Sequence, residues 1–144
     1  MKRKDRRYSE REAKAGVDAV LPGIECWENQ FPNYEIVIEV PEYTSVCPKT
    51  GLPDFGTIKI TYTPDQLCVE LKSFKEYLLA YRNLGIFYEN ATNRILRDFV
   101  KACDPLSVEI EGDFNVRGNI KTTVKTEYKK SVHDRNLPGR PWKD

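Results

Sequence analysis

The spacing of apolar residues along this 144-residue chain changes from a strand period to a helix period and then back again. Alternating apolar and polar residues predict strands over 33–40, 57–63, 66–73 (the weakest of the set), 106–114 and 120–128. Helical spacing between them predicts two helices, over 74–83 and 87–103, with Gly85 breaking the chain between them. Few folds accommodate that order of elements.

The order strands, two helices, strands predicts an α+β domain with both helices on one face of an antiparallel sheet. We expect residues 1–30 to form an N-terminal arm outside the core and 31–128 the folded domain. Residues 129–144 are expected to be a polar, exposed and poorly ordered tail. Sheet edges are usually covered, and one remedy is association with another copy, so we expect a homo-oligomer.

Charge and hydropathy exclude several function classes. The formal net charge is only +1, which gives no electrostatic reason to expect nucleic acid or an anionic membrane as partner. No apolar run approaches the length of a membrane span. The basic segment "MKRKDRRYSEREAK" is not followed by an apolar stretch, so we predict no secretory signal and a cytoplasmic location.

Cysteine and histidine are too dispersed for a metal site. Cys26, Cys47, Cys68 and Cys103 form no CxxC pair, which favours free thiols in a reducing compartment. Since the only histidine, His133, lies in the polar tail, we predict no structural zinc. The chain also lacks the glycine motifs of Rossmann and P-loop nucleotide sites.

The segment "SVCPKTGLPDF" (45–55) carries the first candidate chemistry. Cys47 is either a small buried thiol or a nucleophile presented by a surface turn, with the Lys49 cation lowering its pKa. Asp54 is either a turn residue or a general acid. A thiolate that attacks a carbon–nitrogen multiple bond creates an anionic nitrogen, which a nearby carboxylic acid could protonate.

Other charged residues also allow two interpretations. Glu89 could stabilise a helix start or accept the paired N–H donors of a guanine-like base edge. Glu70 could belong to a strand pattern or face inward toward a ligand. Solvated charges or phosphate contacts are the alternatives for Lys72, Lys75 and Arg117.

Four segments, in order and spacing, resemble the 7-cyano-7-deazaguanine reductases of the queuosine tRNA-modification pathway: "CPKTGLPDFGTI", "ELKSFKEYLLAYRN", "FYEN" and "FNVRGNI". The resemblance covers about 33–128 and is to the short, single-domain type. It implies a tunnelling fold (T-fold), an oligomeric barrel that is commonly a decamer of two stacked pentamers, and active sites at subunit interfaces.

The resemblance also implies a reaction. Cys47 attacks the nitrile carbon of the deazapurine to give a covalent thioimide, Asp54 protonates the nitrogen, and NADPH reduces the adduct twice to 7-aminomethyl-7-deazaguanine. Phosphate contacts to NADPH are implied for Lys72, Lys75 and Arg117. Substrate contacts are implied for Val69, Glu70, Leu71, Tyr88 and Glu89.

Three positions depart from the family pattern. Tyr88 replaces a histidine that many relatives have, so a proton relay at that position is not implied. Ala91 replaces a second cysteine of some relatives, which excludes a disulfide to Cys47 there. Asn119 stands where a glycine often follows.

The nearest rival is an archaeosine-type amidinotransferase, which acts on the same deazapurine in tRNA, adds ammonia and needs no NADPH. Retention of the basic residues that would contact cofactor phosphates favours the reductase, and the near-zero net charge argues against tRNA. A non-catalytic binding module on the same fold is the remaining alternative.

Overall fold

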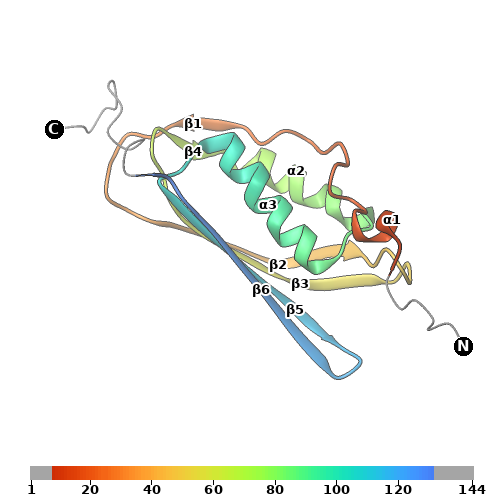
Figure 1. The fold of residues 1–144 in the computed structure, drawn as a ribbon. Coiled ribbons are helices and arrows are strands. Elements are labelled where there is room, and N and C mark those ends of the chain that lie inside the picture. Colours follow the sequence, from red (N-terminus) through yellow and green to blue (C-terminus); the bar gives the residue numbers. More distant parts are fainter. Residues whose placement is uncertain (1–7, 132–144) are drawn as a thin grey trace, which may run out of the picture.

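The computed structural model describes residues 8–131, which form two sheets and a helix layer. The elements are α1 (Glu10–Ala13), β1 (Cys26–Glu28), β2 (Ile36–Val46), β3 (Pro53–Thr63), β4 (Leu67–Val69), α2 (Leu71–Leu79), η1 (Ala80–Asn83), α3 (Tyr88–Cys103), β5 (Ser107–Arg117) and β6 (Ile120–Lys129). An antiparallel sheet has the strand order β2-β3-β5-β6, and β1 pairs with β4 in a second, two-stranded sheet. Both α2 and α3 cover one face of the larger sheet, which confirms the predicted α+β arrangement (Figure 1).

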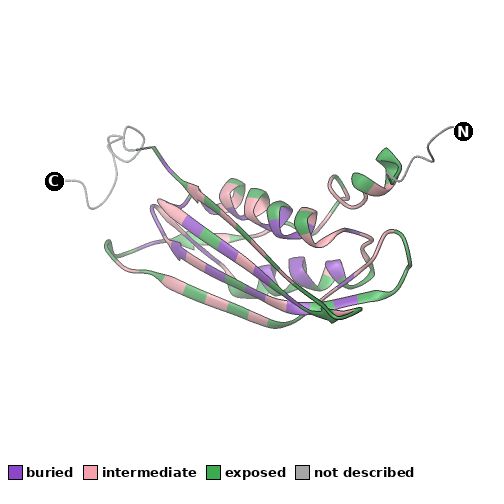
Figure 2. Cartoon of the chain, turned by 60° about the horizontal axis from the view of Figure 1, so that its bottom comes forward, coloured by how far each residue is buried: buried purple, intermediate pink, exposed green. Residues whose placement is uncertain are grey.

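The alternation in the sequence places one row of side chains of the sheet beneath the helices. In β3, Ile58, Ile60 and Tyr62 are buried, while their neighbours along the strand are more exposed, so buried and exposed residues alternate (Figure 2). The Tyr62 ring meets the Phe99 ring of α3 edge-on, with centroids 4.8 Å apart. Such aromatic contacts join the sheet to the helix layer.

The first two strands are longer than their alternation predicts. Their pairing continues through Ser45↔Asp54 and Val46↔Pro53, so only residues 47–52 connect them. The register shifts between Val40 and Tyr43, which interrupts the alternating pattern that identifies a strand in the sequence. Both ends of the predicted turn-rich segment, 45–46 and 53–55, are therefore strand.

The predicted strand over 66–73 is largely wrong. Only Leu67–Val69 is strand, and α2 begins at Leu71, before the predicted helix start at 74. The Glu70 carboxylate accepts hydrogen bonds from the backbone N–H groups of Lys72 (2.8 Å) and Ser73 (2.7 Å). A side-chain acceptor at this position satisfies the free donors of a helix start, which explains the earlier beginning.

Part of the predicted N-terminal arm packs on the core. Leu21, Ile24 and Cys26 are partly buried against the core cluster, and Cys26 belongs to β1. The Arg94 side chain of α3 donates hydrogen bonds to the carbonyl oxygens of Gly16 and Ala19. Residues 21–26 thus take part in the core, while the boundary at residue 30 stays a prediction.

The start of the predicted tail is also buried. Lys130 is 5% exposed and bonds the carboxylates of Asp65 (2.8 Å) and Asp104 (2.7 Å). The prediction of an exposed tail from residue 129 is therefore wrong at Lys130, because two carboxylates neutralise the buried cation. Residues 132–144 of that tail, His133 included, lie outside the described residues. No helix in residues 8–131 has the length and apolar character that crossing a membrane requires.

Candidate active site

Cys47 begins the turn between β2 and β3. Its backbone N–H donates to the Leu52 carbonyl and its carbonyl accepts from the Gly51 N–H, both at 2.9 Å. Gly51 has a φ of 72°, which a glycine adopts at little cost, and this closes the turn. Cys47 is a half-buried, free cysteine.

The turn favours the thiolate form of Cys47. Burial raises the pKa of the thiol. Hydrogen bonds from the Thr50 hydroxyl and from the backbone of Thr50 and Lys49 lower it by more than burial raises it, so the net shift of the pKa is downward. A thiolate is the nucleophilic form of cysteine. The geometry therefore supports the nucleophile interpretation over that of an inert buried thiol.

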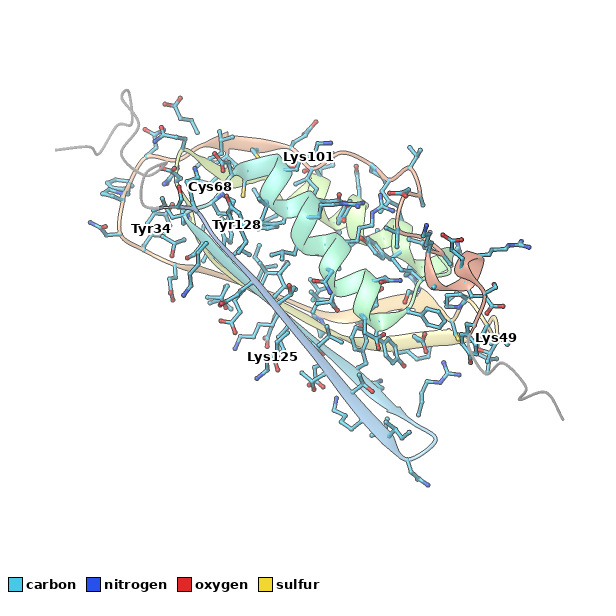
Figure 3. The ribbon with its side chains drawn as sticks, viewed as in Figure 1. Tyr34, Lys49, Cys68, Lys101, Lys125 and Tyr128 are labelled. Atoms are coloured by element: carbon cyan, nitrogen blue, oxygen red, sulfur yellow. The ribbon has the colours of Figure 1, made fainter. Side chains whose placement is uncertain are left out.

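The predicted effect of the Lys49 charge is not what lowers this pKa. Lys49 Nζ lies 3.7 Å from the Glu12 carboxylate and 5.2 Å from the centre of the Tyr8 ring, at the α1 end of the molecule (Figure 3). Its backbone N–H acts on Cys47 instead. The prediction identified the right residue but the wrong group.

Asp54 lies on β3, directly opposite Ser45 and two residues after the turn. It is 5% exposed, and its Oδ1 accepts hydrogen bonds from the Tyr88 hydroxyl (3.1 Å) and from Arg117 Nη1. Arg117 reaches it from the end of β5, where the register with β6 shifts between Phe114 and Arg117. Such irregularities re-aim side chains, and here the result is a Tyr–Asp–Arg cluster.

The backbone brings Tyr88 to this cluster. Val46 of β2 accepts a hydrogen bond from the Ile86 N–H and donates one to the Leu84 carbonyl, both 2.9 Å long. These bonds fix the segment that leads into α3, and Tyr88 is the first residue of that helix. Its ring stacks on Phe114 with centroids 4.1 Å apart, and burial followed by the Asp54 charge raises the pKa of its hydroxyl.

A pocket of about 330 Å³ opens at these residues. It brings together four of the predicted site residues, Cys47, Asp54, Tyr88 and Arg117. Three further lining residues were not singled out in the sequence, namely Phe87, Ile120 and Thr122. Phe87 stands in the motif "FYEN" and Ile120 ends the motif "FNVRGNI", and these motifs were the available signals for them; Thr122 carries none.

Apart from Glu89, which follows Tyr88 at the start of α3, the remaining predicted residues lie elsewhere in the same chain. Val69 pairs with Cys26, whose thiol donates to the carbonyl of Ala102 near the C-terminal end of α3. Tyr88 and Glu89 start that 16-residue helix, which is about 24 Å long. Figure 3 shows the same separation, with Cys68 and Lys49 at opposite ends of the molecule.

The predicted residues around the start of α2 differ in charge and in exposure. Val69 is buried and Leu71 exposed. Glu70 caps α2, and the N–H groups of Ser73 and Lys72 lower the pKa of its carboxyl. Lys72 and Lys75 are exposed on the first turns of α2, as Glu89 is on α3. One chain therefore does not unite all the predicted substrate and cofactor contacts.

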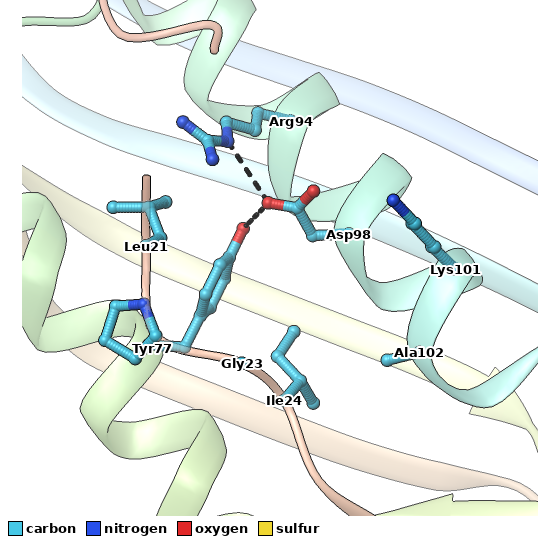
Figure 4. A pocket seen from close by; sticks show the side chains of 9 residues that line it. Leu21, Gly23, Ile24, Tyr77, Arg94, Asp98, Lys101 and Ala102 are labelled. Atoms are coloured by element: carbon cyan, nitrogen blue, oxygen red, sulfur yellow. Dashed lines mark hydrogen bonds and ion pairs between the residues drawn. The ribbon is translucent and has the colours of Figure 1, made fainter. Parts of the chain in front are cut away.

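A second Tyr–Asp–Arg cluster lies in the helix layer beside a pocket of about 220 Å³ (Figure 4). Asp98 Oδ2 accepts from the Tyr77 hydroxyl at 2.5 Å and from Arg94 Nε at 3.1 Å. The Tyr77 and Tyr81 hydroxyls are 2.7 Å apart, and burial strongly raises the pKa of Tyr77. No motif in the sequence pointed to this cluster.

Comparison with known proteins identifies the family of the chain. The family model described as "QueF-like protein" matches residues 53–133, and the chain belongs to that family. Curated relatives in Elusimicrobium minutum and Chlorobaculum parvum are both named NADPH-dependent 7-cyano-7-deazaguanine reductase. The first is 56% identical over 124 residues, covering 85% of this chain and 94% of the relative. The second is 59% identical over 107 residues, covering 73% and 92%.

A solved structure supports the fold. The apo form of an archaeosine synthase described as QueF-Like superposes with a TM-score of 0.62 at 20% sequence identity. The match covers 67% of this chain and 95% of that one. The chain therefore has the T-fold expected from the resemblance.

Proposed function

We propose that this protein is an NADPH-dependent nitrile reductase that converts 7-cyano-7-deazaguanine to 7-aminomethyl-7-deazaguanine in queuosine biosynthesis. The observation that carries the proposal is one pocket that holds a thiol with a lowered pKa and a buried carboxyl group, Cys47 and Asp54. The names of relatives at 56% and 59% identity supply the substrate class.

Cys47 and Asp54 are the proposed catalytic residues. The Cys47 thiolate adds to the nitrile carbon, and the nitrogen takes a proton that Asp54 delivers, giving a thioimide on the enzyme. The covalent adduct makes the carbon a better hydride acceptor than the free nitrile. Substrate contacts are proposed for Tyr88 and Glu89 at the start of α3 and for Val69, Glu70 and Leu71 at the start of α2.

Two exposed lysines fit a dinucleotide phosphate. Lys72 and Lys75 project from the first turns of α2, and exposed ammonium groups of this kind bind phosphate oxygens. Arg117 fits less well, because its Nη1 already donates to Asp54 and to the Pro53 carbonyl. When bound, NADPH supplies the hydride.

The separation of the two residue groups favours a homo-oligomer. The end of one chain that carries Glu70 and Lys72 would complete the Cys47 pocket of another, as in a barrel assembled from several copies. We propose a decamer of two pentamers in the cytoplasm, where the free cysteines would stay reduced. Sedimentation or mass photometry would measure the number of subunits.

The central test follows absorbance when the protein is mixed with 7-cyano-7-deazaguanine, before and after NADPH is added. We expect a thioimide band that collapses as NADPH is oxidised and that is missing in Cys47→Ala. A band that persists with NADPH would favour the amidinotransferase alternative, with which the archaeosine synthase shares its fold. Absence of any band would refute the proposal.

A further inference from the structure

The two oxygens of the Asp54 carboxyl group are not equivalent. Both the Tyr88 hydroxyl and Arg117 Nη1 donate to Oδ1. Within residues 8–131, no donor contacts Oδ2. Asp54 lines the pocket together with Cys47, and the carboxyl group there has one oxygen with two donors and one oxygen without a donor among the described residues.

Both donors are themselves held in place. The Tyr88 ring lies on Phe114, and its carbonyl accepts a hydrogen bond from the Thr92 hydroxyl at 2.9 Å. Arg117 Nη1 also donates to the Pro53 carbonyl at 3.2 Å. Because burial and Asp54 raise the pKa of Tyr88, its phenol keeps its proton at neutral pH and stays a donor.

We propose that Tyr88 and Arg117 are positioning residues that fix Asp54 so that its Oδ2 carries the proton between Cys47 and the nitrile nitrogen. The inference rests on the proposed function. The Cys47 S–H bond breaks and its proton passes to Oδ2, while an Sγ–C bond forms as one C–N π bond breaks. The proton then moves from Oδ2 to nitrogen, which leaves a neutral thioimide and an ionised Asp54.

This role differs from the roles that the family resemblance implies, which are a substrate contact for Tyr88 and a cofactor contact for Arg117. The two assignments separate cleanly, because thioimide formation requires substrate but no NADPH. A residue that acts only on the cofactor leaves this half-reaction unchanged. A residue that only binds substrate alters its Kd and leaves the rate constant at saturation unchanged.

The test is rapid mixing of the full-length protein with 7-cyano-7-deazaguanine, without NADPH. Tyr88→Phe and Arg117→Gln should each form the thioimide about tenfold to a hundredfold more slowly at saturation, with the substrate Kd unchanged. Tyr77→Phe removes the matching hydroxyl from the other cluster and should form it at the wild-type rate.

Tyr88→His provides an independent readout, because imidazole titrates near pH 6.5 and the phenol does not. We expect a new inflection near that pH in the rate profile of this variant. The positioning role is overturned if Arg117→Gln loses only NADPH turnover, if Tyr88→Phe changes only the Kd, or if Tyr88→His keeps the wild-type profile. A wild-type protein that forms no thioimide would instead refute the proposed function.

Discussion

Two Tyr–Asp–Arg clusters in this chain share their chemistry and differ in their surroundings. In both, a tyrosine hydroxyl and an arginine nitrogen donate to the same carboxylate oxygen, which belongs to Asp54 in one cluster and Asp98 in the other. The Asp98 cluster lies between α2 and α3. The Asp54 cluster lies at the end of the sheet, beside a thiol.

The remaining donors of each arginine mark the difference in role. Arg94 is 8% exposed, and its two terminal nitrogens bind the Gly16 and Ala19 carbonyls, so it joins the N-terminal segment to α3. Arg117 is more exposed and, among residues 8–131, makes one further bond, to the Pro53 carbonyl. The same three residue types therefore form a structural clamp where each arginine nitrogen makes a bond, and a candidate catalytic device where the carboxylate shares a pocket with a thiol.

The largest expected contrast comes from the same substitution in the two clusters. Asp54→Asn should slow thioimide formation by about 10²- to 10⁴-fold, because it removes the group that moves the proton. Asp98→Asn should leave the rate unchanged and lower the free energy of unfolding by up to about 3 kcal/mol, since it leaves the buried Arg94 cation without its carboxylate. Rapid-mixing absorbance and urea denaturation measure the two effects. If both variants change the rate of thioimide formation, or the free energy of unfolding, by the same amount, the two clusters do not differ in role.

The bonds of Arg94 to the N-terminal segment can be removed while the positive charge is kept. Arg94→Lys retains a cation for Asp98 but loses the paired bonds to the Gly16 and Ala19 carbonyls, and we expect a loss of about 2 kcal/mol in stability. Limited trypsin digestion should then cleave faster at Arg11 and Lys14. Arg97→Lys, which alters a more exposed contact to Val17, serves as the control. Unchanged digestion in Arg94→Lys would show that other contacts hold the segment.

The sequence predicted the Asp54 cluster only in part. Cys47 and Asp54 stand in a short motif, and the helix starting near Tyr88 follows from its periodicity. The pairing of Asp54 with Arg117 depends on a register shift at the end of β5, which leaves no trace in local spacing. The sequence therefore suggested a phosphate contact for Arg117 but not its bond to Asp54.

Long-range contacts explain the other differences. The start of α2 depends on Glu70 turning its carboxylate onto the helix, whereas the alternation in "QLCVELKS" suggested a strand. Lys130 is a tail residue by composition, and its contacts to Asp65 and Asp104, both distant in sequence, make its burial favourable. The Asp98 cluster requires α2, α3 and the N-terminal segment together, so no single stretch of the sequence predicts it.

Removing the tyrosine hydroxyl from each cluster should again separate an effect on stability from an effect on rate, with smaller changes than the two aspartate variants give. Tyr77→Phe leaves the 2.5 Å bond to Asp98 unmade in the buried layer, and we expect a loss of about 1 to 2 kcal/mol. Tyr88→Phe keeps the ring stack on Phe114 at a more exposed position and should lose less than about 0.5 kcal/mol. Thermal unfolding of both variants in one buffer measures the difference. A larger loss in Tyr88→Phe would make that hydroxyl structural.

The smallest expected effect concerns the thiol that distinguishes the Asp54 cluster. Thr50→Val removes a hydroxyl that lowers the pKa of Cys47, so the pKa should rise. The inflection of iodoacetamide alkylation should accordingly move to higher pH, and the rate at pH 7 should fall because less thiolate is present. Lys49→Gln keeps the backbone N–H that acts on the thiol and should leave the inflection in place. Both variants are made in a Cys26→Ser background, which removes the other half-buried thiol from the alkylation signal. If the inflection moves to higher pH in Lys49→Gln, the charge of the Lys49 side chain lowers the pKa of Cys47 after all.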